Sequence, residues 1–159
     1  MSCYNLFETD PAKHPGKYTQ RSKIMKLSEI KVGDKASIRK TVTEGDVYTY
    51  AGISGDQNPM HVDKVYGEAS QFGSRIAHGM FTAGYVSAVL GMKLPGPGCI
   101  YMSQEMRFVA PVRFGDTIET VCEVTEIIPE KKRVILSTTC TNQDGKDVLV
   151  GKAMMYVPE

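Results

Sequence analysis

A long apolar segment, from Gly79 to Met92, constrains the fold of this chain more than any other feature. Apolar residues occupy nearly all sides of the predicted helix, and its only polar interruptions are Thr82, Tyr85 and Ser87. At about 1.5 Å per residue the helix is roughly 21 Å long, and the prolines and glycines of residues 95–98 end it. A helix without a polar face must be surrounded by protein.

The sequence around this helix is mostly strand-like. Residues 100–109 alternate at period two, as a strand with two different faces requires. Apolar and β-branched patterns predict four more strands, at residues 36–42, 117–127, 133–141 and 148–157. Turns are expected at residues 129–132 and at Asp144-Gly145, the second with a type I′ signal.

The order of these elements indicates an α+β domain. A strand, a short helix, the buried helix and then a run of antiparallel strands imply a curved antiparallel β-sheet wrapped around one long buried helix, the hot dog arrangement. The length of 159 residues suits a single domain, assigned here to residues 25–159. Residues 1–24 are polar and rich in breakers, and they read as an N-terminal arm, or as lying outside the native start if Met25 is the true one.

Composition excludes several classes of partner. With 19 Lys and Arg against 18 Asp and Glu, the net charge of +1 provides no field for attracting nucleic acid or an anionic membrane. The sequence contains neither a signal-like leader nor a membrane-length apolar run. The four cysteines have no Cys-x-x-Cys spacing and fit free thiols in a reducing compartment. We therefore expect a cytoplasmic protein.

Asp56 and His61 are the strongest candidates for chemistry. A short amphipathic helix with Thr43 as its N-cap leads directly to them. On one helix they would point about 140° apart, but Gly55 and Pro59 favour a sharp loop that brings both to one point. A carboxylate and an imidazole facing one pocket suit general acid–base catalysis, with Asn58 in support. The alternative is ordinary turn chemistry, in which Asp56 caps the next turn.

The start of the buried helix supplies a second element. Its first N–H groups lack intrahelical partners, so Gly79 N–H can bind a developing negative charge on an oxygen. Ser87 lies two turns further along and either faces the site or bonds back to a helix carbonyl. His78 is interpreted as structural, and His14 lies in the N-terminal arm.

Other kinds of site lack support in the sequence. The three histidines are scattered without the spacing of a zinc or iron site, so no metal is expected. No Gly-x-Ser-x-Gly elbow indicates a serine hydrolase, and prolines break the glycine-rich stretch at residues 94–98. We expect no cofactor.

The segment around the candidate pair resembles a known signature. Tyr50 and residues 53–61, Ile-Ser-Gly-Asp-Gln-Asn-Pro-Met-His, are similar to R-specific enoyl-CoA hydratases of the MaoC-like dehydratase family. Further stretches resemble the same family in the same order: residues 72–80, 94–96, 108–112 and 115–116. The resemblance covers roughly Met25 to the C-terminus. Met60 replaces the family's more usual branched aliphatic residue.

The resemblance implies a hot dog fold, a homodimer, and reversible syn hydration of trans-2-enoyl-CoA to (R)-3-hydroxyacyl-CoA. It implies that Asp56 and His61 are the acid–base pair, that Asn58 and Ser87 support them, and that Gly79 N–H binds the thioester oxygen. The substrate is an acyl-CoA thioester or its acyl carrier protein equivalent. Two alternatives stay open: a hot dog thioesterase and a non-catalytic module that binds acyl thioesters.

Overall fold

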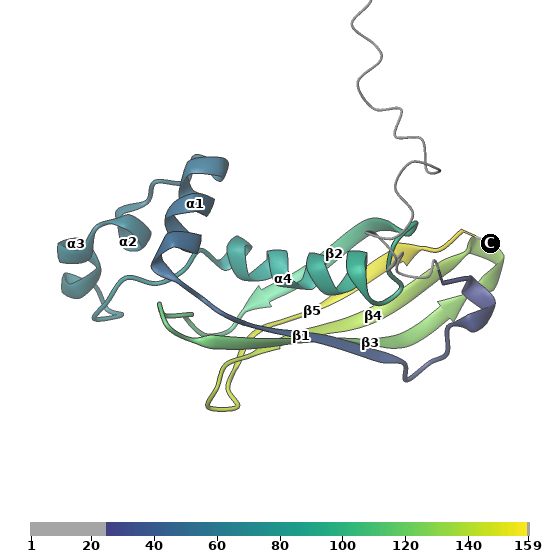
Figure 1. The fold of residues 1–159 in the computed structure, drawn as a ribbon. Helices are drawn as coiled ribbons and strands as arrows, with labels where there is room; N and C mark the ends of the chain where they lie inside the picture. The colour runs from purple at the N-terminus through teal and green to yellow at the C-terminus, as the bar shows by residue number, and fades with distance from the viewer. Residues whose placement is uncertain (1–24, 159) are drawn as a thin grey trace, which may run out of the picture.

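The computed structural model describes residues 25–158, which form one curved sheet and four α-helices (Figure 1). The predicted N-terminal arm, residues 1–24, lies outside the described residues. The helices are α1 (Glu44–Ser54), α2 (Pro59–Val62), α3 (Lys64–Ala69) and α4 (Gly79–Met92), with short 3-10 helices η1 (Leu27–Glu29) and η2 (Pro129–Lys131). The strands are β1 (Lys35–Thr41), β2 (Ile100–Phe108), β3 (Thr117–Ile128), β4 (Arg133–Thr141) and β5 (Asp147–Tyr156).

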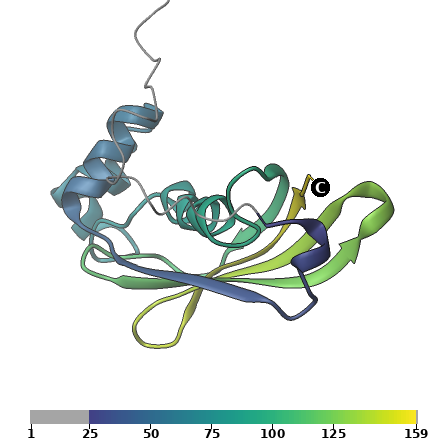
Figure 2. The same ribbon diagram turned by 45° about the vertical axis from the view of Figure 1, so that its right-hand side comes forward.

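The five strands form a single antiparallel sheet in the order β1-β3-β4-β5-β2. The sheet curves, and α4 lies along its concave face, while α1, α2 and α3 gather beyond one end of it (Figures 1 and 2). The predicted hot dog arrangement is therefore confirmed, because one long helix is wrapped by one sheet.

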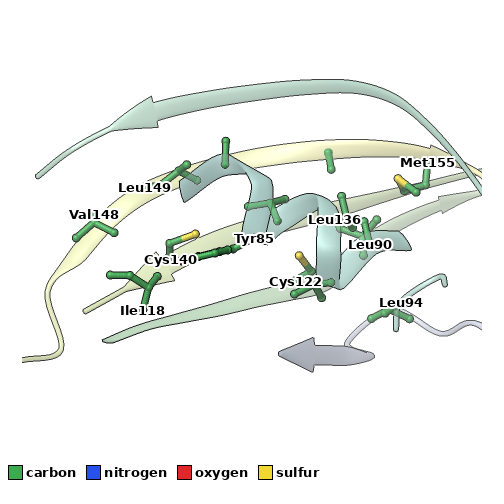
Figure 3. Close-up of a cluster of buried hydrophobic side chains, with 14 of the residues drawn as sticks. Tyr85, Leu90, Leu94, Ile118, Cys122, Leu136, Cys140, Val148, Leu149 and Met155 are labelled. Carbon is green, nitrogen blue, oxygen red and sulfur yellow. The ribbon is translucent and has the colours of Figure 1, made fainter. Parts of the chain in front are cut away.

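The core lies between α4 and the sheet (Figure 3). Leu90 of α4 is fully buried, as is Leu136 at the centre of β4. Side chains alternate between half-buried and buried over the first eight residues of β3 and the last six of β4, as period two requires. The free thiols of Cys122 and Cys140 belong to this core, and burial raises the pKa of Cys122 to about 12. They are structural side chains rather than reactive ones.

Strand β2 departs from the expected pattern. Most of its residues are exposed on both faces, including the apolar side chains of Ile100, Met102 and Phe108. The strand lies at one edge of the sheet, and among residues 25–158 it pairs only with β5, so only one of its two backbone edges is hydrogen-bonded to another described strand. Alternation in the sequence thus predicted the strand correctly but not its exposure. Among residues 25–158, no helix is both long and apolar enough to span a lipid bilayer.

Truncating Leu136 to Ala tests the packing of α4 against the sheet. Removing a fully buried Leu side chain leaves a cavity, so we expect the free energy of unfolding to fall by about 2–5 kcal/mol. Urea denaturation at fixed protein concentration measures the change. The matched control is Val65→Ala, since Val65 is 76% exposed on α3 and its truncation should change the free energy by about 0.5 kcal/mol or less. Equal effects of the two substitutions would contradict this core.

Candidate active site

A cavity of about 500 Å³ opens where the start of α4 meets α1 and α2. Asp56, His61, His78 and Gly79 all line it. Its remaining walls are mostly apolar and come from residues 108–112, with Tyr50, Phe72, Ile76, Ala77, Met80, Thr82 and Val148. A mostly apolar cavity with a few polar groups at one point is the usual form of a small-molecule site.

Local turn chemistry places Asp56 at this cavity. Gly55 ends α1 in the left-handed region at φ 78°, and its N–H donates to the Ala51 carbonyl at 2.9 Å. The chain then turns, and one Asp56 carboxylate oxygen accepts the backbone N–H of Asn58 at 3.2 Å. The Asn58 side chain accepts the N–H of Met60 at 3.0 Å and thereby caps α2. Asn58 thus contacts Asp56 through its backbone N–H, and its side chain caps the helix that carries His61. A supporting role in catalysis stays a prediction.

His61 lies in the short helix α2 rather than in an open loop. Pro59 occupies the first turn of α2, where its missing N–H costs nothing, and it keeps Asn58 extended at ψ 126°. The expected bend at Pro59 is present, and a single helical turn follows it. His61 Nδ1 lies 2.8 Å from the Ile76 carbonyl. Because a carbonyl only accepts, Nδ1 carries the proton, and the lone pair of Nε2 is left to act as a base.

His78 joins this pair, although the sequence indicated only a structural role for it. The His78 ring lies 3.8 Å from the His61 ring, centroid to centroid, with 33° between the planes. His78 Nε2 donates to the backbone carbonyl of Asp56 at 2.9 Å. The side chain is 2% exposed, and the Tyr50 ring packs 4.9 Å from it. The one available signal was its place directly before the buried helix.

The three side chains form one compact cluster. One carboxylate oxygen of Asp56, one ring nitrogen of His61 and one ring nitrogen of His78 all lie within 4.8 Å of one another. Two hydrogen bonds of about 2.8 Å each can span that distance, so a single water molecule can contact both Asp56 and His61. Asp56 and His61 therefore lie close together, as the sequence predicted, and His78, which was interpreted as structural, lies beside them.

A carboxylate with two imidazoles is also a possible metal-binding set, so the directions of the ring nitrogens matter. One nitrogen of each ring already donates to a carbonyl, and the rings pack against each other with a tilt of 33°. The second nitrogen of each ring is the atom left for proton transfer or for coordination. A metal-free site stays a prediction.

Burial lowers the pKa of His61 below its ordinary value of 6.5, and the nearby His78 ring lowers it further. The hydrogen bond to the Ile76 carbonyl and the charge of Asp56 act in the opposite direction. The net lowering keeps the ring neutral, and able to accept a proton, at neutral pH.

The start of α4 faces the same cavity. His78 is the N-cap of α4, and the N–H of Gly79 belongs to the first turn, whose donors have no partner inside the helix. A Cβ at position 79 would approach the Phe108 ring to 2.9 Å, so only glycine allows this close packing. An oxygen in the cavity can accept a hydrogen bond from this end of α4 and gain from the helix dipole.

Ser87 does not lie with the other candidates. It is exposed and lines a second cavity of about 380 Å³, together with Met80, Ala83, Gly84 and residues 101–104 and 106. Within one chain the structure brings together Asp56, His61, Asn58 and Gly79 but leaves Ser87 outside. Its supporting role stays a prediction.

The fold and the cluster define a hot dog protein with an acid–base site, and comparisons with known proteins agree. The MaoC like domain matches residues 27–145, and the chain belongs to this family. It is 52% identical over 132 residues to an (R)-specific enoyl-CoA hydratase of Rhodospirillum rubrum, covering 83% of this chain and 91% of the relative. A 3-hydroxybutyryl-CoA dehydratase of Methylorubrum extorquens is 44% identical over 137 residues, with 86% and 87% covered.

Solved structures show the same similarity. The unliganded R-hydratase PhaJ1 from Pseudomonas aeruginosa superposes with a TM-score of 0.80 at 42% identity, covering 84% of this chain and 86% of that one. The (R)-hydratase from A. caviae gives a TM-score of 0.79 at 35% identity, with 81% and 98% covered. The family and the fold predicted from the residues are thereby confirmed.

A pH titration tests the electrostatics of the site. Because burial disfavours the imidazolium form, His61 should take up its proton at a pH below 6.5 as the solution is acidified. NMR of the ring protons, assigned by comparison with His61→Gln, gives the midpoint. The same protein unfolded in urea is the control, and its histidines should titrate near 6.5. A midpoint at or above 6.5 in the folded protein would contradict the burial described here.

Proposed function

We propose that this protein is an R-specific enoyl-CoA hydratase, which adds water reversibly to a trans-2-enoyl thioester to give the (R)-3-hydroxyacyl thioester. The observation that carries the proposal is the cluster of Asp56 and His61 within reach of one water molecule, opposite the N-terminus of α4 in a mostly apolar cavity. The relatives named as hydratases and dehydratases catalyse this reaction in its two directions.

The geometry supports addition of water in two proton-transfer steps. A water molecule held by Asp56 and His61 transfers one proton to Nε2 of His61 while its oxygen bonds to the β-carbon. The π electrons of the alkene move toward the thioester, and the N–H of Gly79 stabilises the negative charge that develops on the carbonyl oxygen. The acid–base pair then returns a proton to the α-carbon. Both additions come from the one face of the alkene that the pair occupies, so addition is syn.

The cavity fits the two ends of such a substrate. Its apolar walls suit an acyl chain, and its polar groups are gathered at Asp56, His61 and Gly79. The thioester group can belong to CoA or to acyl carrier protein, since the acyl–pantetheine portion is common to both. Location in the cytoplasm stays a prediction, and fractionation of the source cells would test it.

Substitution of the pair tests the proposal. Asp56→Asn and His61→Gln each remove a proton-transfer group, so we expect turnover of crotonyl-CoA to fall by about 10²–10⁴ while circular dichroism shows an unchanged fold. Asp63→Asn is the matched control, because Asp63 only caps α3 through the N–H of Tyr66, a cap that Asn also provides. Loss of enoyl absorbance measures turnover.

The same assay separates the alternatives. A thiol-trapping reagent added in parallel detects free CoA, which a thioesterase would release and a hydratase would not. Chromatography of the product with assigned stereochemistry distinguishes the R from the S alcohol. Near-native hydration by Asp56→Asn would refute the assigned roles, and tight binding of acyl-CoA without turnover by the wild type would leave a binding module.

We also propose that the protein is a homodimer paired along β2. The free edge of β2 presents unpaired backbone groups, and its exposed apolar side chains continue onto α4 at Met80, which is 55% exposed. A second copy related by a two-fold axis would cover both the strand and the second cavity. Exposed apolar side chains along an edge strand are typical of an interface between subunits.

Light scattering tests the dimer. The wild type should give twice the 17.5 kDa mass of the chain. Met102→Lys places a charge on β2 and should shift the mass toward the monomer, because a desolvated lysine destabilises the interface. Val32→Lys introduces the same charge at an exposed position before β1, the opposite edge of the sheet, and should remain dimeric. A monomeric wild type at micromolar concentration would refute the proposal.

A further inference from the structure

His78 is a buried imidazole that contacts both members of the acid–base pair. It donates from Nε2 to the Asp56 carbonyl at 2.9 Å and stacks on the His61 ring at 3.8 Å. Its side chain lines the cavity but is 2% exposed, so the cavity reaches it without opening it to bulk solvent. A ring in this place is fixed by its neighbours on several sides.

The bond to Asp56 ties the catalytic turn to the buried helix. Asp56 and His78 are 22 residues apart in sequence, and Asp56 lies on an exposed turn between α1 and α2. The local bonds of that turn hold its shape but do not fix its place relative to α4. The Nε2 bond does so, because it reaches from the N-cap of α4 to the backbone that carries the carboxylate.

The stack on His61 restrains the second member. The Ile76 carbonyl fixes the Nδ1 side of the His61 ring, and the His78 ring covers one of its faces. That cover keeps water from the face, which contributes to the burial of His61. His78 Nδ1 has no hydrogen-bond partner among residues 25–158, so the Nε2 bond decides which of the two ring nitrogens faces Asp56. A flip of the His78 ring would forfeit that bond.

His78 also adjoins the group that receives the thioester oxygen. It directly precedes Gly79, so the same residue sits between the acid–base pair and the first N–H of α4. We infer that His78 is a positioning residue, which holds Asp56 and His61 in register with the N-terminus of α4. The inference deepens the proposed hydratase function and rests on it for its catalytic consequence.

Two substitutions separate the bond from the stack. His78→Phe keeps an aromatic ring against His61 but leaves the Asp56 carbonyl without its donor. We expect kcat for crotonyl-CoA to fall by about 10- to 100-fold with KM changed by less than about threefold, because a shift of about 1 Å in reacting groups costs that much. The NMR midpoint of His61 should stay below 6.5, since its ring remains covered.

His78→Gln keeps an amide donor near the Asp56 carbonyl but removes the ring. Water then reaches His61, so the pH midpoint of its titration should rise toward 6.5. The pH at which kcat/KM falls on the acid side should rise by the same amount. Phe81→Leu is the matched control, because Phe81 of α4 packs on Tyr50 of α1 and on Tyr85 of α4 without lining the cavity. It should leave both the His61 midpoint and kcat unchanged. Wild-type kcat and pH profile in both His78 variants would overturn the inference.

NMR of the wild-type protein provides a test that no misfolded variant can obscure. The nitrogen shifts of His78 should show a proton on Nε2 and a lone pair on Nδ1, and nuclear Overhauser effects should join the two rings. The opposite tautomer would overturn the inference even if both variants fail to fold. Absence of wild-type hydration would instead refute the proposed function, so the two failures are distinguishable.

Discussion

The burial of α4 inside the curved sheet is the constraint from which the site follows. The helix packs its buried side, with Val86, Val89 and Leu90, against the concave face of the sheet, whereas its other side is exposed at Met80, Gly84 and Ser87. That docking fixes the place of its first residue. The segment before it is clamped as well, since Ala77 donates to the Val112 carbonyl at 2.8 Å and Ile76 pairs with Arg113. Hydrophobic packing thus places the N-terminus of α4 beside the helices α1, α2 and α3 (Figure 1).

Local patterns predicted most of the fold because they act over a few residues. The bounds of α4 match the apolar run, and Thr43 caps α1 in a reciprocal box with Asp46. The hairpin at Asp144-Gly145 was expected to be type I′, and this was wrong. Within the described residues only Lys132 and glycines have positive φ, because the Asn142 side chain captures the N–H groups of Asp144 and Lys146 and shapes a different turn.

The site was predictable from the sequence only where residues close together in the chain determine the local backbone conformation. Gly55 and Pro59 bend the chain between Asp56 and His61, and both effects are visible in the sequence. His78 lies 17 residues beyond His61, and its stack depends on how α4 docks, which no local pattern contains. Ser87 lies away from the other candidates within one chain for a geometric reason, because eight residues on an α-helix turn it roughly 80° away from Gly79. That rotation places it in the second cavity.

Both imidazoles of the site bond to backbone carbonyls rather than to carboxylates, and this choice has a consequence for the chemistry. A carboxylate partner would strongly favour the imidazolium form of His61 and raise its pKa, whereas a carbonyl raises it less, so burial prevails and the ring stays neutral. A backbone carbonyl does not titrate and accepts a hydrogen bond at every pH. The proton on Nδ1 of His61 therefore stays in place while Nε2 exchanges protons. Since the acceptor is the backbone of residue 76, side-chain substitution there cannot remove it. The site therefore needs particular side chains at His61, His78 and Asp56, but not at position 76.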